Sequence, residues 1–372
     1  MRGYSRRGIL AAGLAMAATP ALAASDGFDR FARDQIEKGA IPGLAVGLAK
    51  DGKVVFAKGY GLADIARRQP VSDRTVFHIA SITKTITAAA IMRLVEAGKL
   101  GLDEPVAPRL DFPLANPRHP DAPITVRQLL THTSSISDAR YYEIDFREPG
   151  HDAKRQLGDL LKSYLAPGGA HYSPEACFLA GAPGSTWDYS NIGYGLLGYL
   201  AGRVGGEDMR EQITRHVFKP LGMDAARWTI EGPGQSATPY DVVDGKLTPA
   251  AHMGMPDWPA GAVRASVLDM TRYVAACADG GGAMLSQTDM ARLLEMHTPA
   301  GLPEWLTGQG LGWQASLLDG VARPNHWGGD PGVFTAAYLN PAARTGVAIL
   351  TNTSITPAAR DAVKAIAARL LT

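Results

Sequence analysis

The sequence predicts an α+β fold, with an antiparallel β-sheet built from both termini and flanked by helices, and with a mostly helical inserted domain. Two strand-like runs surround the dipeptide Asp51-Gly52, which is a strong hairpin signal. Further strand-like runs follow one another between residues 312 and 353, around a second such dipeptide, Asp319-Gly320. Strands at both ends with a helical middle favour one sheet closed by the two termini. A binding site is then expected in the cleft between the two parts.

Helical periodicity marks the other elements in chain order. A short helix is expected over residues 28–39, where apolar residues share one face and a glycine ends the run. After the first hairpin, a helix should run from about Ser81 to Glu96, and helices separated by Pro- and Gly-rich loops continue to about residue 300. An amphipathic helix over 357–371 closes the chain.

This pattern divides the chain into two parts. We expect residues 25–84 and 306–372 to form the α/β domain, and residues 85–305 to form the mostly helical domain with the active-site loops. The two cysteines, Cys177 and Cys277, are too few for a disulfide framework and lack metal-ligand spacing. Whether they pair with each other is left open.

The first 24 residues read as an export signal, outside the fold. A basic start is followed by an apolar run over residues 9–18 and by Ala21-Leu22-Ala23, which fits a signal-peptidase site. The pair Arg6-Arg7 is typical of twin-arginine signals. The apolar run is shorter than the roughly 20 residues that span a bilayer. We therefore expect a periplasmic or otherwise exported protein with no stable membrane span after cleavage.

The net charge gives no sign of a polyanionic partner. The full chain carries 37 basic and 36 acidic residues, and cleavage of residues 1–24 removes three arginines and no acid. The near-neutral mature chain has no general attraction for nucleic acid or for anionic lipid. A small molecule is the expected partner, and the oligomeric state is not predicted.

Ser81-Ile82-Thr83-Lys84 opens the helix expected after the first hairpin. Residues i and i+3 share a helix face, so Lys84 can reach Ser81. A lysine withdrawn from water loses pKa and becomes able to activate a serine hydroxyl as a nucleophile. The structural alternative is that Ser81 caps the helix and Lys84 lies in solvent. The four residues alone do not decide between a catalytic and a structural role.

Two later tripeptides supply further candidates. Tyr189-Ser190-Asn191 lies in a loop just before a helix, where a phenol can relay protons and an amide can hold a carbonyl or the lysine. His326-Trp327-Gly328 ends a strand and runs into Gly329, so that a substrate can approach a backbone without side chains. The N–H groups of Ser81 and Gly329 would then form an oxyanion hole.

Two other patterns carry less weight. Residues 193–198 match G-x-G-x-x-G but lie inside a helical pattern and follow no strand, so dinucleotide binding is not expected. His132 stands near the end of a helical run, and we expect it to satisfy local backbone groups and not to act as a base.

In chain order, S-I-T-K, Y-S-N and H-W-G resemble the three motifs of the serine β-lactamase and penicillin-binding-protein superfamily. The likeness is strongest to the class C β-lactamase-related serine hydrolases, which include D,D-carboxypeptidases, D-aminopeptidases and family VIII carboxylesterases. "LLTHTSS" and "PGSTWDYSNIGYGLLG" add to it. The resemblance runs over nearly the whole mature chain and implies an antiparallel sheet flanked by helices plus a helical domain.

The resemblance also implies roles for individual residues. Ser81 would be the acylated nucleophile, with Lys84 and Tyr189 as the proton-transfer pair and the principal base left open. No metal or organic cofactor is implied. Substrate contacts would come from Asn191, His326, Trp327 and Gly328, and the oxyanion hole from the N–H groups of Ser81 and Gly329.

The third motif departs from the Lys-Thr-Gly of β-lactamases, whose cation and hydroxyl help to hold a substrate carboxylate. His326 is charged only in part at neutral pH, and Trp327 offers no hydroxyl. We therefore expect an exported serine hydrolase that cleaves an ester, amide or peptide through an acyl-serine, and that is more an esterase or D-peptidase than an efficient β-lactamase. A class C-like β-lactamase, an acyltransferase and an inactive cell-wall peptide binder remain alternatives.

Overall fold

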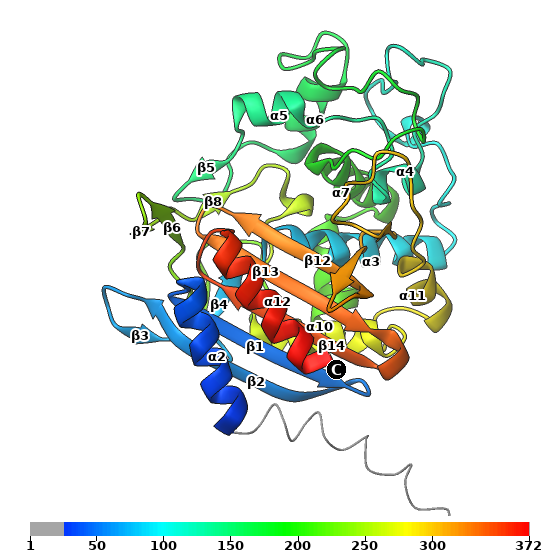
Figure 1. Cartoon of the computed structure of the whole chain (residues 1–372). Coiled ribbons are helices and arrows are strands. Elements are labelled where there is room, and N and C mark those ends of the chain that lie inside the picture. Colours follow the sequence, from blue (N-terminus) through cyan, green and yellow to red (C-terminus); the bar gives the residue numbers. More distant parts are fainter. Residues whose placement is uncertain (1–25, 372) are drawn as a thin grey trace, which may run out of the picture.

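The computed structural model describes residues 26–371, so the expected export signal lies outside the described residues. Eight antiparallel strands form the main sheet in the spatial order β10-β11-β12-β13-β14-β1-β2-β3. β1 and β14 pair along their whole length, so the two ends of the chain form one sheet (Figure 1) and the predicted fold class is confirmed. In chain order the strands are β1 (Gly43–Lys50), β2 (Lys53–Asp64), β3 (Gln69–Pro70), β10 (Gly308–Gln309), β11 (Gln314–Leu318), β12 (Val321–Asp330), β13 (Val333–Asn340) and β14 (Thr345–Thr351).

Both predicted Asp-Gly turns are present. Asp51 (φ 48°) and Gly52 (φ 71°) join β1 to β2. Asp319 (φ 47°) and Gly320 (φ 75°) join β11 to β12 in the same way. A type I′ turn needs positive φ at both central residues, which aspartate tolerates and glycine adopts freely.

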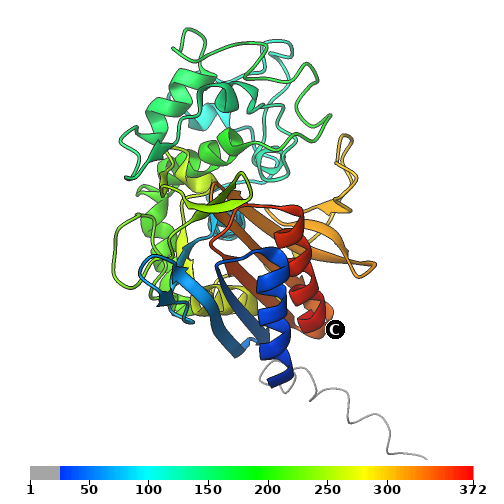
Figure 2. The ribbon, with the colours of Figure 1, turned by 60° about the vertical axis from the view of Figure 1, so that its left-hand side comes forward.

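Helices cover both faces of the sheet. α2 (Asp26–Gly39) and α12 (Pro357–Leu371) lie side by side on one face, as Figures 1 and 2 show. α10 (Val267–Ala278) packs on the opposite face, against β1 and β14. Gly47 of β1 permits this approach, because a Cβ there would lie 1.7 Å from Oγ1 of Thr271. α10 comes from the segment expected in the helical domain, and its apolar side nevertheless packs on the sheet.

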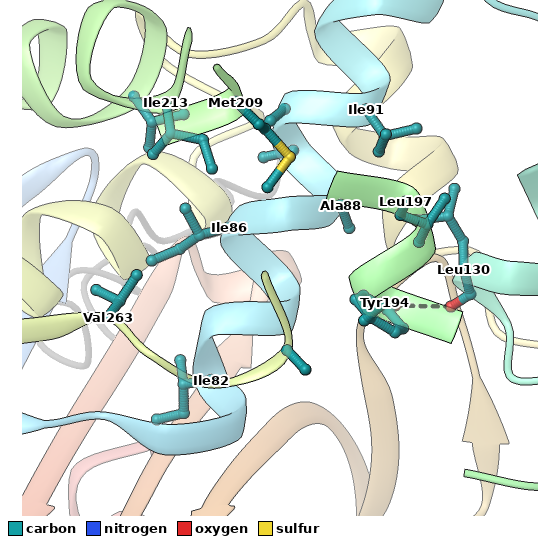
Figure 3. Close-up of a cluster of buried hydrophobic side chains, with 14 of the residues drawn as sticks. Ile82, Ile86, Ala88, Ile91, Leu130, Tyr194, Leu197, Met209, Ile213 and Val263 are labelled. Atoms are coloured by element: carbon teal, nitrogen blue, oxygen red, sulfur yellow. Dashed lines mark hydrogen bonds between the residues drawn. The ribbon is translucent and has the colours of Figure 1, made fainter. Parts of the chain in front are cut away.

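α3 (Thr83–Glu96) lies between the sheet and the other helices. A 3-10 turn, Ala80–Ile82, leads into it, and together they are the helix expected from about Ser81 to Glu96. Nearly all of its side chains are buried, and Figure 3 shows its isoleucines in one apolar cluster with Leu197, Met209 and Ile213. The site therefore starts from a rigid, central helix.

Short elements complete the chain. The remaining helices are α4 (Val126–Leu130), α5 (Ala139–Ile144), α6 (Leu157–Leu165), α7 (Asn191–Gly205), α8 (Met209–Ile213), α9 (Lys219–Leu221) and α11 (Gln287–Leu293). Three two-stranded ladders pair β4 (Val76–His78) with β9 (Arg264–Ser266), β5 (Glu148–Pro149) with β8 (Met253–Gly254), and β6 (Tyr240–Val243) with β7 (Lys246–Pro249). Cys177 and Cys277 are both buried free thiols. Within residues 26–371, no helix is long and apolar enough to cross a membrane.

Candidate active site

Ser81 lies on the 3-10 turn that leads into α3, partly exposed between two buried neighbours. The residue before it, Ala80, has φ 46°, a left-handed conformation that costs a non-glycine residue about 1–2 kcal/mol. Such strain persists only where surrounding contacts impose it. Here Thr335 of β13 contributes, because its hydroxyl donates to the carbonyl of Ile79 at 2.8 Å. The turn that presents Ser81 is thus fastened to the sheet.

Lys84 follows Ser81 by one helical turn and has no exposed surface. Its Nζ donates to Oγ of Ser81 at 3.2 Å, to Oδ1 of Asn191 at 2.7 Å and to the main-chain carbonyl of Ala260 at 2.8 Å. Burial lowers the pKa of Lys84 to about 7, although two nearby carboxylates act in the opposite direction. A large fraction of Lys84 is therefore neutral near pH 7 and able to accept a proton from a serine.

Tyr189 lies over Lys84. The centre of its ring is 4.7 Å from Nζ of Lys84, and its hydroxyl is close enough to the Ser81 side chain for the serine to affect the pKa of the phenol. Burial raises the pKa of Tyr189 well above 10, so the phenol keeps its proton at neutral pH. His132 packs on the same ring at 4.4 Å, and its Nδ1 accepts from the N–H of Ser190 at 3.1 Å. His132 thus serves the local backbone, as expected, and also supports Tyr189.

Asp138 fixes the start of α7 and with it the side chain of Asn191. Its carboxylate accepts from the hydroxyl of Ser190 at 2.8 Å, from the N–H of Asn191 at 2.5 Å and from the N–H of Ile192 at 3.2 Å. Burial raises the pKa of Asp138 to about 6, against the effect of these donors. Sequence reasoning missed this residue, because a single acid in a loop carries no periodic signal.

Asp257 and Tyr142 also lie beside the site, and no sequence motif predicted this. Asp257 has no exposed surface, and its Oδ1 accepts from the hydroxyl of Tyr141 at 3.0 Å. Its Oδ2 has no hydrogen-bond partner among the residues described. Burial raises the pKa of Asp257, and Lys84 opposes this effect. Tyr142 is 65 % exposed and its hydroxyl accepts from Nδ2 of Asn191 at 3.0 Å, so this ring borders the site.

His326 faces the cluster from β12. Its ring is 6.4 Å from that of Tyr189, and the residue is 2 % exposed. Nδ1 lies 2.8 Å from the carbonyl of Trp327, and a carbonyl only accepts, so the proton of the neutral ring is on Nδ1. Burial, with a smaller effect from Lys84, lowers the pKa of His326 to about 3. The imidazole is therefore uncharged at neutral pH.

Gly328 allows β12 to pack directly on the Ser81 turn. A Cβ at this position would lie 2.2 Å from the carbonyl oxygen of Ile79 and 2.3 Å from Oγ1 of Thr335, which leaves no room for a side chain. Gly329 follows on the same strand and is exposed. Gly329, whose N–H is predicted to form the oxyanion hole with the N–H of Ser81, thus directly follows the residue that contacts the Ser81 turn.

The indole of Trp327 lies on the other face of β12. Its Nε1 donates to the hydroxyl of Tyr338 at 2.8 Å, its ring stacks on Trp305 at 5.8 Å, and Nζ of Lys364 in α12 lies 5.6 Å from its centre. Side chains alternate between the faces of a strand, so His326 and Trp327 must point in opposite directions. The structure therefore gathers the side chains of Ser81, Lys84, Tyr189, Asn191 and His326 with Gly328, but not the indole of Trp327.

A cavity elsewhere does not change this assignment. A hollow of about 760 Å³ lies between the end of α10, α11 and the β13–β14 turn. It is lined by Cys277, Met290, Arg344 and their neighbours, and by none of the clustered residues. The convergence of polar groups around Ser81 marks the candidate active site better than volume does.

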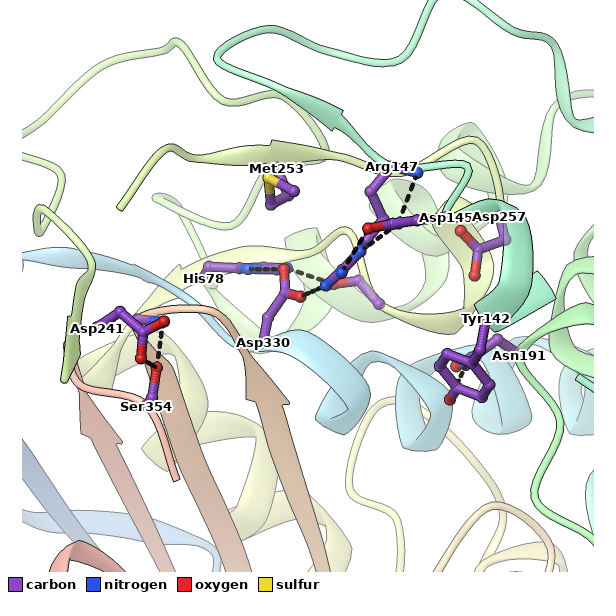
Figure 4. Close-up of polar contacts among 12 residues, drawn as sticks. His78, Tyr142, Asp145, Arg147, Asn191, Asp241, Met253, Asp257, Asp330 and Ser354 are labelled. Carbon is purple, nitrogen blue, oxygen red and sulfur yellow. Dashed lines mark hydrogen bonds and ion pairs between the residues drawn. The ribbon is translucent and has the colours of Figure 1, made fainter. Parts of the chain in front are cut away.

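Arg147 joins two carboxylates beside the cluster (Figure 4). Its Nε and Nη2 donate to Asp145 at 2.7 and 2.8 Å, and its Nη1 donates to Asp330. Asp330 comes directly after Gly329, its side chain is 5 % exposed, and its Oδ2 lies 3.8 Å from Nδ1 of His78. Burial raises the pKa of Asp330 to about 6, against the effect of Arg147. No sequence pattern predicts that Arg147 and Asp330 meet.

Comparison with known proteins agrees with this geometry. The profile of the Beta-lactamase family matches residues 28–371. Esterase EstB of Burkholderia gladioli is 30 % identical over 385 aligned residues, which cover 91 % of this chain and 93 % of that protein.

Solved structures give the same result. A penicillin-binding protein homologue from Pyrococcus abyssi, described as octameric, superposes with a TM-score of 0.74 and 28 % identity, covering 91 % of this chain and 76 % of that one. A penicillin-binding protein from Bacillus halodurans gives 0.73 and 27 %, covering 91 % and 98 %. The resemblance seen in the motifs is thereby confirmed, and the chain belongs to the beta-lactamase family and is a serine hydrolase.

Proposed function

We propose that this protein is an exported serine hydrolase that cleaves small esters, and secondarily D-configured amides, through an acyl-Ser81 intermediate. The observation that carries the proposal is the buried Nζ of Lys84, 3.2 Å from Oγ of Ser81 and with a pKa of about 7. The similarity to Esterase EstB over nearly the full length of both chains supports an ester as the first substrate class to test.

Acylation begins when Oγ of Ser81 attacks the substrate carbonyl carbon and its proton passes to neutral Lys84. The negative oxygen of the tetrahedral intermediate accepts hydrogen bonds from the N–H groups of Ser81 and Gly329. The bond to the leaving group then breaks. Tyr189 gives its proton to the departing oxygen or nitrogen and regains one from protonated Lys84, so the lysine ends this step neutral.

Deacylation repeats the same steps with water as the nucleophile. A water molecule attacks the acyl carbon while one of its protons passes through Tyr189 to Lys84, and the oxyanion is held as before. Collapse of the intermediate releases the carboxylic acid and returns the proton to Oγ of Ser81. Asn191 holds the lysine throughout, since its Oδ1 accepts from Nζ at 2.7 Å.

The third motif supports esters over β-lactams as substrates. His326 stands where β-lactamases have lysine, and its low pKa leaves it uncharged at neutral pH. Trp327 stands where they have a hydroxyl, and its indole lies on the opposite face of β12, against Trp305 and Tyr338. A substrate carboxylate would find neither of its usual partners.

Export is supported by the sequence of residues 1–24. N-terminal sequencing of the secreted or periplasmic protein should find a mature chain that begins close to residue 24. An uncleaved chain that stays in the cytoplasm would contradict this part of the proposal.

A substrate panel with a nucleophile variant tests the activity. A fluorophosphonate should add one label to Ser81, and 4-nitrophenyl butyrate should be turned over faster than a cephalosporin, a D-Ala-D-Ala peptide or a D-amino amide. Ser81→Ala should lose turnover and labelling, whereas Ser163→Ala, in α6 and partly exposed, should keep both. Full turnover by Ser81→Ala would show that the mechanism is wrong.

A further inference from the structure

We propose that Arg147, Asp145 and Asp330 form a charge cluster that makes this site discriminate against substrates carrying a carboxylate next to the scissile bond. The inference rests on the proposed function, because it concerns substrates of the Ser81 reaction. It goes further by assigning specificity to residues outside the three sequence motifs.

The cluster lies beside the proposed oxyanion hole. Asp330 shares one face of β12 with His326 and Gly328, because side chains alternate along a strand. Gly328 contacts the turn that carries Ser81, and residues i and i+2 of a strand are about 7 Å apart. The carboxylate of Asp330 therefore flanks the position at which the substrate carbonyl is expected.

The guanidinium of Arg147 is already paired with two carboxylates and is not free to bind a substrate carboxylate. Arg147 uses Nε and Nη2 on Asp145 and Nη1 on Asp330, so two carboxylates share one cation. The side chain of Asp330 is 5 % exposed, which keeps this ion pair out of bulk water and limits its screening. The cluster carries a net negative charge whenever both acids are ionised.

Neither basic side chain beside Ser81 compensates. Arg264, which also interacts with Asp330, is 2 % exposed and donates to the carbonyls of Ala262 and Met253, and His78 is kept uncharged by burial, which lowers its pKa to about 3. Lys84 has no exposed surface and already donates to Ser81, Asn191 and Ala260. His326 donates to the Trp327 carbonyl through Nδ1, and its Nε2 is buried without a partner among the described residues, so it offers a substrate no donor. A carboxylate placed here meets negative charge and finds no free donor on either side chain.

The buried Asp138 adds further negative charge when it is ionised, since it accepts from the N–H of Asn191, the partner of Lys84. An uncharged group experiences none of this repulsion. Removing one carboxylate from about 8 Å away changes the interaction with an anion by about five-fold at an intermediate effective dielectric constant. The change is expected in kcat/KM for anionic substrates only.

The test uses 2-acetoxybenzoate and its methyl ester, which differ by one negative charge directly beside the scissile acetyl ester. The measured quantity is the ratio of kcat/KM for the anion to that for the neutral ester, so intrinsic reactivity cancels when variants are compared with the parent. The parent should prefer the neutral ester. Asp330→Asn should raise the ratio about five-fold, and Arg147→Met, which leaves two carboxylates without their cation, should lower it.

Two further variants keep the result interpretable. Asp145→Asn, at a half-exposed position, should raise the ratio even if Asp330→Asn folds poorly. Asp51→Asn, in the β1–β2 turn far from the site, should leave it unchanged. A ratio within two-fold of the parent in both Asp330→Asn and Asp145→Asn would overturn the inference. Ser81→Ala should hydrolyse neither of the two esters. If it still hydrolysed them, the proposed function would be wrong, and the specificity inference would not be the part at fault.

Discussion

Nζ of Lys84 lies 2.7 Å from Oδ1 of Asn191, closer than the 3.2 Å that separates it from Oγ of Ser81. The amide of α7, and not the serine, is therefore the tighter partner of the lysine. Asp138 holds the N–H of Asn191, and Tyr142 accepts from its Nδ2. The lysine is thus aimed by a residue that is itself fixed from two sides.

We expect kcat/KM for a neutral ester to rise with pH through about 7 and to level off above about 8. The proton acceptor is neutral Lys84, whose pKa burial lowers to about 7, so the active fraction grows as pH rises through that value. The pKa of Tyr189 is raised, so its ionisation causes no fall in this range. A flat profile between pH 5.5 and 8.5 would contradict this assignment.

Asn191→Asp should move the rise in kcat/KM to higher pH by about one unit or more. The variant places a carboxylate where the amide oxygen accepts from Lys84, and a nearby opposite charge favours the protonated lysine. The pH profile of the variant, set beside that of the parent, measures the shift. Asn191→Ala, which removes the partner without adding charge, should lower kcat with a smaller displacement of the profile. A shift to lower pH in Asn191→Asp would refute the role of Asn191 as the partner of the base.

Gly328→Ala should reduce kcat at least ten-fold and destabilise the fold by about 1–3 kcal/mol, because its Cβ would overlap the carbonyl of Ile79. Either β12 or the Ser81 turn must then move. Gly202→Ala is a matched control, since a Cβ there meets only an ordinary contact at 3.6 Å in α7, and alanine favours a helix. Urea unfolding and ester turnover measure both effects. Parent-like kinetics in Gly328→Ala would show that the strand does not need this close contact.

Trp327→Phe should lower the free energy of unfolding by about 1 kcal/mol and leave kcat/KM within two-fold of the parent. The indole packs on the α12 side of the sheet, and the substitution removes its hydrogen bond to Tyr338. Chemical denaturation and nitrophenyl ester kinetics test the two statements separately. If kcat/KM fell more than ten-fold at unchanged stability, the indole would have to reach the substrate after all.

Asp138→Ala should destabilise the protein by about 3 kcal/mol, since it leaves the hydroxyl of Ser190 and two N–H groups at the start of α7 without their acceptor. Asp34→Ala, at an exposed position of α2, should change stability by less than about 0.5 kcal/mol. Denaturant unfolding compares the two. Equal stabilities would mean that water replaces the carboxylate at no cost.

Sequence reasoning reached the fold class because the relevant signals are local. Asp51-Gly52 and Asp319-Gly320 specify tight turns through their own backbone preferences, and the closing helix over 357–371 shows its periodicity without help from other segments. Ser81 and Lys84 also share a helix face at fixed spacing, but the order of all three motifs was needed to identify them as a site. The placement of α10 on the sheet depended on contacts between distant segments, such as Thr271 with Gly47.

The surroundings of the site were out of reach for the same reason. Asp257 and Asp138 influence Lys84 from loops that no spacing rule connects to it. Arg147 meets Asp330 across a separation of 183 residues. Trp327 was expected beside the substrate because it belongs to the third motif, but strand alternation places it on the face of β12 opposite to His326. Only the three-dimensional arrangement tells which of two adjacent residues faces the serine.

The pairing of β1 with β14 also means that the sheet beside the site is complete only when the end of the chain is present. A nascent chain complete to residue 320 already contains Ser81, Lys84 and Asn191, but it lacks β12, β13 and β14. The strand that carries Gly328 and the partners that close the sheet have yet to emerge from the ribosome. We therefore expect a chain truncated at residue 320 to show no esterase activity, because the strand that completes the site around Ser81 is absent.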